Sequence, residues 1–123
     1  MYKRQDLIGW TPPAGAFDLV SAHFLHLAGE QRRTVYARLA AAVAPGGTLL
    51  LVAHEEPVGE HAAEHRASGW DMTGRFSTAA EEAAALDPAE WEVLVAEHRP
   101  RTTTTPDGGT VSRPDVVVRA RRR

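Results

Sequence analysis

Histidines and neighbouring carboxylates are the residues of this chain best suited to chemistry. The run His54-Glu55-Glu56 is followed by His61 and His65, whose i, i+4 spacing places both imidazoles on one face of a helix. Neutral imidazoles and carboxylates are ligands for zinc and similar metals. The H-E-x-x-H order of a zinc protease is absent. The alternatives are a metal site and a solvated polar loop, and we expect the loop and no metal.

A second pair of histidines follows an apolar segment. His23 and His26 come directly after residues 17–22, which read as a short strand. Imidazole titrates near neutral pH, so either residue is a candidate general base. The alternative is that one packs at a strand-to-helix corner while the other is solvated. We favour this alternative because the sequence shows no partner that would tune the pKa of either ring.

A strand–helix–strand pattern positions these residues. The strand at 17–22 follows a turn cluster at 11–15, and a helix is predicted over 30–43. Residues 44–47, Ala-Pro-Gly-Gly, end that helix, and the apolar run 48–53 indicates a strand buried in a parallel sheet. The helix has an apolar stripe of Val35, Leu39, Ala42 and Val43, and Arg32, Arg33 and Arg38 fall largely off it. The pattern predicts a βαβ unit with a right-handed crossover.

The second half of the chain predicts smaller elements. Residues 54–74 are expected to form a polar loop with helical turns around 60–67. Thr78 and Glu81 form a capping box that opens a short helix ending near Leu86. Strands are predicted at 91–97 and 115–119, joined as an antiparallel hairpin with a turn at Pro106-Asp107-Gly108-Gly109.

Composition excludes several classes of protein. The chain has 123 residues, of which 14 are basic and 16 acidic, and a net charge of −2. This charge excludes a protein that coats nucleic acid without sequence preference. It has no cysteine, which excludes disulfide scaffolds and cysteine zinc sites. Apolar runs are shorter than the roughly 18 residues of a membrane span, and no secretory signal is present. We therefore expect a cytoplasmic protein that contacts neither membrane nor nucleic acid.

Two of these segments together resemble a known family. Ala16-Phe17-Asp18-Leu19-Val20, a helix, and then Ala44-Pro45-Gly46-Gly47-Thr48-Leu49-Leu50-Leu51-Val52 are similar to the second half of class I S-adenosylmethionine-dependent methyltransferases. In that family these are the fourth and fifth strands of a seven-strand sheet, and a terminal hairpin follows. The resemblance covers roughly residues 6–121. It is closest to small-molecule enzymes of the broad type that includes tellurite and thiopurine methyltransferase-like proteins.

The resemblance implies a fold, a cofactor and a set of binding residues. The fold is α/β, a partial Rossmann-like methyltransferase fold with strands four to seven of the family sheet and the last strand antiparallel. The cofactor is S-adenosylmethionine and the partner is a small-molecule methyl acceptor. Asp6 matches the residue that accepts a hydrogen bond from the adenine amino group, with Leu7 beside it. Ala22 and His23 match the segment that contacts the methionine part of the cofactor, while the catalytic residues stay unassigned.

The chain departs from the family in its first part. The family opens with a strand and a GxGxG loop that lets the backbone approach the cofactor, and neither this loop nor the acidic residue after the next strand is present. The only lysine, Lys3, lies within residues 1–5, which we interpret as a non-native scar. Residues 6–123 are then expected to be the C-terminal part of a methyltransferase domain. Alone they should be inactive and should bind the cofactor weakly or not at all.

A different class of function remains open. If the first three strands are absent, the strand that starts at Phe17 is an exposed sheet edge, and such edges pair with other chains. The alternative prediction is therefore a non-enzymatic α/β interaction module that self-associates through this edge.

Overall fold

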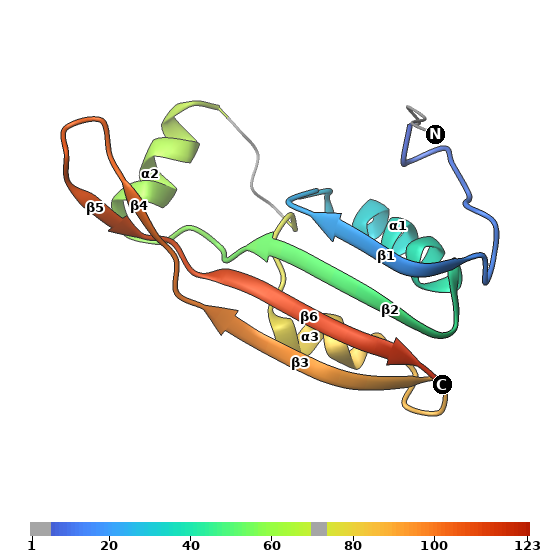
Figure 1. Cartoon of the computed structure of the whole chain (residues 1–123). Helices are drawn as coiled ribbons and strands as arrows, with labels where there is room; N and C mark the ends of the chain where they lie inside the picture. Colours follow the sequence, from blue (N-terminus) through green and yellow to red (C-terminus); the bar gives the residue numbers. More distant parts are fainter. Residues whose placement is uncertain (1–5, 70–73) are drawn as a thin grey trace.

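The computed structural model describes residues 6–69 and 74–123, so the proposed scar at residues 1–5 lies outside the described residues (Figure 1). The first strand, helix and strand lie close to the predicted positions. They are β1 (Phe17–His23), α1 (Gly29–Ala41) and β2 (Val43–His54). The remaining elements are α2 (Gly59–Ala67), α3 (Ala79–Ala84), β3 (Trp91–Arg99), β4 (Thr102–Thr104), β5 (Thr110–Ser112) and β6 (Asp115–Arg122).

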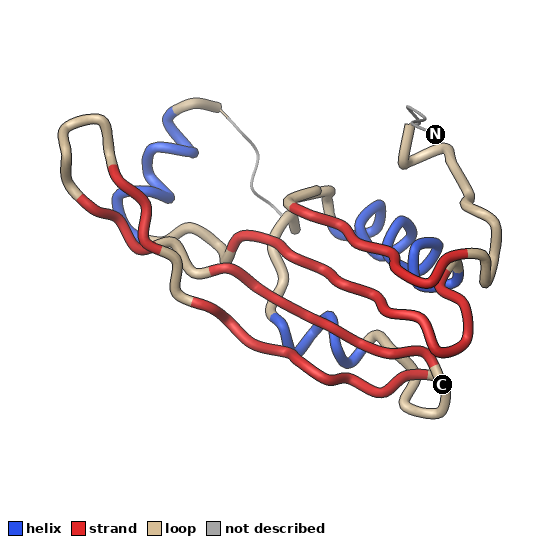
Figure 2. The backbone as a smooth tube through the Cα atoms, viewed as in Figure 1, coloured by secondary structure: helices blue, strands red, loops and turns tan. Residues whose placement is uncertain are grey.

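Four strands form the main sheet in the order β1-β2-β6-β3 (Figures 1 and 2). β1 and β2 run parallel, as a βαβ unit requires, and β6 runs antiparallel to both of its neighbours. The antiparallel last strand confirms the prediction. The β3–β6 connection is longer than a simple turn because it carries a second hairpin, β4–β5, which extends the molecule at one end of the sheet (Figure 1).

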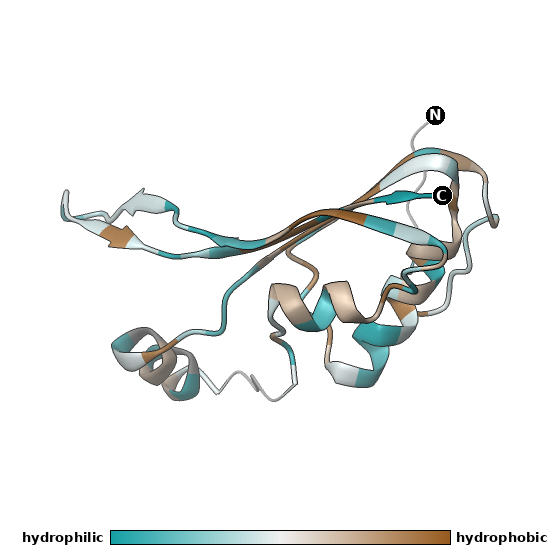
Figure 3. Cartoon of the chain, turned by 90° about the horizontal axis from the view of Figure 1, so that it is seen from below, coloured by the Kyte–Doolittle hydropathy of each residue, from teal (hydrophilic) through white to brown (hydrophobic). Residues whose placement is uncertain are grey.

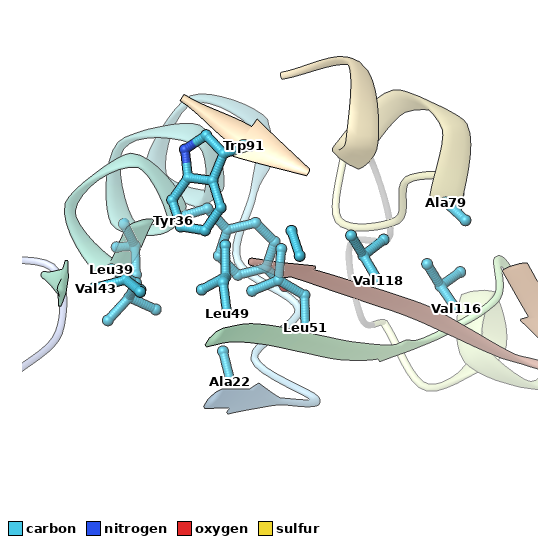
Figure 4. Packing of buried hydrophobic residues seen from close by; sticks show 12 residues of the cluster. Ala22, Tyr36, Leu39, Val43, Leu49, Leu51, Ala79, Trp91, Val116 and Val118 are labelled. Atoms are coloured by element: carbon cyan, nitrogen blue, oxygen red, sulfur yellow. The ribbon is translucent and has the colours of Figure 1, made fainter. Parts of the chain in front are cut away.

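The core lies between the sheet and two helices. Figure 3 shows the helices on one side of the sheet, and α1 and α3 both pack on strands of this sheet. Val43, Leu49 and Val118 are fully buried, and burying one such side chain contributes about 1.5–3 kcal/mol. Trp91 closes the cluster from the edge strand β3 (Figure 4).

One charged residue of α1 is buried, unlike what its position off the apolar stripe suggested. Arg32 is 8% exposed and its Nη1 donates to the carbonyl of Gly74 at 2.5 Å. Its Nε lies 3.4 Å from Oε1 of Glu82, on α3. The flank of α1 that carries Arg32 is therefore covered by α3 and the segment before it, a tertiary arrangement that helical periodicity does not contain.

The glycine pair before the apolar strand forms a bulge rather than a loop outside the sheet. α1 ends at Ala41 and β2 already starts at Val43, so the strand begins earlier than predicted. Phe17 pairs with Val43 and Leu19 pairs with Thr48. Between these two pairs β2 advances by five residues and β1 by only two. A Cβ at Gly47 would lie 2.9 Å from the Asp18 carbonyl oxygen, which explains why glycine is required there.

The shorter helices also agree with the sequence. Thr78 caps α3, because its hydroxyl accepts a hydrogen bond from the Glu81 amide at 3.1 Å. The Glu81 carboxylate in turn accepts one from the Thr78 amide, which confirms the capping box. α2 occupies the segment where helical turns were expected. Within the described ranges, no helix is long and apolar enough to cross a membrane.

Candidate functional site

The ends of β1 and β2 lie at the same edge of the sheet because the two strands are parallel. After β1 the chain turns sharply, and Phe24 and His26 have positive φ angles of 56° and 47°. Left-handed backbone is uncommon for such residues and marks a constrained corner. The Phe24 amide donates to the Val52 carbonyl at 2.8 Å, which fixes this corner against β2.

Aromatic rings from three segments meet at this edge, in stacked and tilted pairs. The ring of His54, the last residue of β2, lies 4.4 Å from that of Phe24 and 5.1 Å from that of His26, both in stacked geometry. The ring of Phe76, which precedes α3, lies 5.1 Å from that of His26. The result is a wall of flat rings at the carboxyl end of the parallel pair.

A buried carboxylate holds one edge of the His54 ring. Asp115 opens β6 and lies directly opposite His54 in the β2–β6 register. Its Oδ1 is 3.2 Å from Nδ1 of His54, and its Oδ2 accepts from Nε of Arg101 at 2.9 Å. The Asp115 side chain is 12% exposed, against 40% for His54 and 38% for Arg101.

Two neighbours compete for Nδ1 of His54, because a terminal nitrogen of Arg101 also lies 3.2 Å away. If Arg101 donates to Nδ1, that nitrogen carries no proton. Oδ1 of Asp115 then faces the nitrogen lone pair and receives no hydrogen bond from it. If Nδ1 carries the proton, it donates to Asp115, and the half-exposed guanidinium turns its spare N–H to water. Leaving the more buried group unpaired costs more, so we assign the proton to Nδ1.

His26 is the less polar of the two stacked imidazoles. Both of its ring nitrogens are buried and have no hydrogen-bond partner in the part of the chain that the structure describes. Burial lowers the pKa of His26 below its usual value, and the neighbouring His54 lowers it further. His26 is therefore neutral at pH 7 and presents ring surface rather than an accessible nitrogen.

A cavity of about 330 Å³ lies against the ring wall. His26, His54 and Phe76 line it together with the start of the segment leading to α2 and the end of the β4–β5 hairpin. This volume suits a small organic molecule. The residues contributed by these two segments are Glu55, Glu56, Pro57, Val58, Val111, Ser112, Arg113 and Pro114.

Glu55, the first carboxylate after His54, is paired with a different histidine. Glu55 Oε2 pairs with Nδ1 of His98 at 2.8 Å, and Nε2 of that ring accepts from the Ala79 amide at 3.2 Å. Among the described side chains, no three histidines or carboxylates could hold a metal ion. The side chains of His61 and His65, the other half of that hypothesis, lie outside the described residues.

The residues matched to the cofactor lie along the free edge of β1. Leu7, Ala22 and His23 line one groove of about 340 Å³, with Trp10 also in its wall. Asp6, one residue before Leu7, is exposed, and its Oδ1 accepts from the Ile8 amide at 3.1 Å. Three of the four residues thus face one groove, and Asp6 lies next to it in the chain.

The two histidines after β1 are separated by the structure. His23 lines the edge groove, whereas His26 lines the cavity with His54. Asp115 and Arg101 were not predicted as partners of His54. His54 and Asp115 are 61 residues apart in the sequence and meet only through the antiparallel register of β2 and β6.

Several solved structures with similar folds are methyltransferases. TehB from Haemophilus influenzae has a TM-score of 0.66 at 14% identity, covering 98% of this chain and 40% of that one. A putative methyltransferase from Bacillus halodurans C-125 has a TM-score of 0.65 at 14% identity, and the match covers 96% of this chain and 69% of that one. An S-adenosylmethionine-dependent methyltransferase from Mesorhizobium loti has a TM-score of 0.63 at 16% identity, and the match covers 98% of this chain and 68% of that one.

The chain therefore has a class I methyltransferase-like fold. It spans between 40% and 70% of the length of eight solved structures that it resembles. Comparison with protein-family profiles and with curated protein sequences gives no match.

Proposed function

We propose that residues 6–123 form the C-terminal part of a methyltransferase domain that transfers a methyl group from S-adenosylmethionine to a small-molecule acceptor. The observation that carries this proposal is the sheet order β1-β2-β6-β3 with an antiparallel β6, together with the likeness to methyltransferase structures over almost the whole chain. This arrangement matches strands four to seven of the sheet that the sequence resemblance implies.

The groove at the edge of β1 suits the cofactor. Its walls are apolar at Leu7 and Ala22 and aromatic at Trp10, a surface on which a flat base can pack. Oδ2 of the exposed Asp6 keeps its lone pairs for an exocyclic amino group, because only Oδ1 is engaged by the Ile8 amide. We propose Asp6, Leu7, Ala22 and His23 as cofactor-binding residues.

When bound, S-adenosylmethionine supplies an electrophilic methyl group on a positively charged sulfur. The residues of this chain then have to bind the acceptor, orient it and exclude water. Correct positioning can supply several kcal/mol of the barrier. The cavity beside His54 lies at the carboxyl ends of β1 and β2, where open α/β sheets bind their ligands. Its volume supports a small molecule as the acceptor.

Isothermal titration with S-adenosylhomocysteine tests this assignment. The chain lacks a GxGxG loop, so we expect weak binding, with a dissociation constant in the millimolar range. Asp6→Asn should weaken binding about five-fold, the equivalent of about 1 kcal/mol for one exposed charge-assisted hydrogen bond. Asp18→Asn is the matched control, because Asp18 is exposed on β1 but does not line the groove. Equal affinity of the two variants would refute the assignment of Asp6.

A second function is favoured by a separate observation. β1 is an edge strand of the described sheet, and Leu19 and Phe17 on it are 62% and 42% exposed. Long apolar edges pair with other strands. A non-enzymatic module that associates with a second copy through β1 is thus the alternative, and the oligomeric state in solution separates it from a monomeric binding domain.

A further inference from the structure

We propose that His54, held by Asp115 and Arg101, is the group that takes the proton from the acceptor, and that the acceptor is an uncharged aromatic compound bearing a hydroxyl group. This inference rests on the proposed function, because it names the substrate class of the same domain. The two nevertheless depend on different places in the molecule, the cavity beside His54 and the groove beside β1.

The geometry leaves one nitrogen of His54 available to a ligand. Nδ1 is engaged by Asp115, so Nε2, on the opposite edge of the ring, carries the free lone pair. His54 lines the cavity and its side chain is 40% exposed. Nε2 makes no hydrogen bond among the residues described here. A carboxylate that fixes the tautomer and orientation of an imidazole is a common way to prepare a proton acceptor.

Asp115 and Arg101 are positioning residues in this arrangement. Asp115 is fixed by the β2–β6 register, and Arg101 neutralises its second oxygen. Asp115 and Arg101 bring opposite charges within 3.2 Å of Nδ1, so they act by fixing the tautomer and the orientation of the ring. The other charged or titratable groups facing His54 are His26, in stacked contact, and the cavity-lining Glu55, Glu56 and Arg113.

The walls of the cavity define the class of acceptor. The rings of His26, His54 and Phe76 line it, and a lining of aromatic rings favours a flat aromatic ligand. Two charged groups beside the cavity are already paired, since Asp115 binds Arg101 and Glu55 binds His98. The other charged residues of the lining, Glu56 and Arg113, are exposed and of opposite sign, so they do not favour an acceptor of either charge.

A hydroxyl group completes the match. A phenol has a pKa near 10, so at neutral pH it is a poor nucleophile until a base removes its proton. In the proposed step the O–H bond breaks, its electron pair stays on the oxygen, and the proton forms a bond to Nε2 of His54. The oxygen is then ready to attack an electrophilic methyl group.

An ionisable phenol tests the inference without cofactor or turnover. 4-Nitrophenol is the probe, because its phenolate absorbs visible light and its phenol does not. Binding to the intact chain should raise the ratio of phenolate to phenol about three-fold at a fixed pH, the equivalent of half a pKa unit. His54→Phe keeps a ring in the stack and should abolish the change. Asp18→Asn, at an exposed position of β1 that lines neither the cavity nor the groove, should leave it intact.

The outcomes are distinct. Failure of the probe to bind, or an unchanged phenolate ratio on binding, overturns the inference even if S-adenosylhomocysteine binds. A normal phenolate response without binding of S-adenosylhomocysteine supports the inference and contradicts the assignment of the β1 groove to the cofactor. An equal response in His54→Phe and the unchanged chain also overturns it.

Nitrogen-15 NMR of the histidine rings gives a second test, and its first measurement uses the unchanged chain, so it does not depend on whether a variant folds. The unchanged chain should show His54 as the Nδ1–H tautomer at neutral pH. Asp115→Asn should shift the ring toward the Nε2–H tautomer, a signature that a purely structural role for Asp115 would not produce. Finding the Nε2–H tautomer in the unchanged chain would overturn the role of His54 as proton acceptor.

Discussion

The ion pair between Arg32 and Glu82 predicts a measurable coupling between α1 and α3. The two groups are 3.4 Å apart and their side chains are 9% and 13% exposed. At an effective dielectric constant of about 20, their Coulomb attraction is about 5 kcal/mol before desolvation is subtracted. Removing one partner of such a pair leaves a buried charge, so Arg32→Met should lower the free energy of unfolding by about 3 kcal/mol.

A double-mutant cycle isolates the pair from the other bond of Arg32, to the Gly74 carbonyl. Arg32→Met, Glu82→Gln and the double variant would be unfolded in urea and followed by circular dichroism. We expect a coupling free energy of about 2 kcal/mol, because the double variant leaves no unpaired charge. Arg33→Met, at the exposed neighbouring position, should change stability by less than about 0.5 kcal/mol. Additive single effects, within about 0.5 kcal/mol, would refute the reasoning.

Three further predictions concern pH and association. Burial, and next the charge of Glu82, raises the pKa of Tyr36 to about 12. The urea concentration at the unfolding midpoint should therefore fall as pH rises from 10 toward 12. A midpoint that does not change over this pH range would contradict the burial of Tyr36. Burial lowers the pKa of His26, so the stability it contributes is present above its ordinary value of 6.5 and is lost as pH falls below that value. Urea unfolding at pH 7.5 and 5 should show less of this loss in His26→Phe. Leu19→Lys should reduce any dimer seen by light scattering after size exclusion, and a dimer that persists unchanged would exclude the β1 edge as the interface.

The order of elements could be predicted because it depends on local signals. The apolar run 48–53, the capping box at Thr78 and the turn at 106–109 each mark a boundary by chemistry within a few residues. The family resemblance added the antiparallel direction of β6. These signals need no knowledge of which segments meet in space.

Tertiary contacts could not be predicted in the same way. Arg32 lies off the apolar stripe of its own helix and is buried only because α3 brings Glu82 beside it. His54 and Asp115 meet because β2 and β6 pair in one particular register, and a shift of one residue would put them on opposite faces. A single sequence contains no direct signal for either pairing.

The cofactor groove at the edge of β1 is the central claim, and protein-observed NMR during titration with S-adenosylhomocysteine tests it most directly. We predict amide shift changes that centre on Leu7, Ala22 and His23 and saturate in the millimolar range. Absence of changes at these amides, or their appearance only in another part of the chain, would contradict the claim. Tight one-to-one binding would contradict the proposal that residues 6–123 hold only part of the cofactor site.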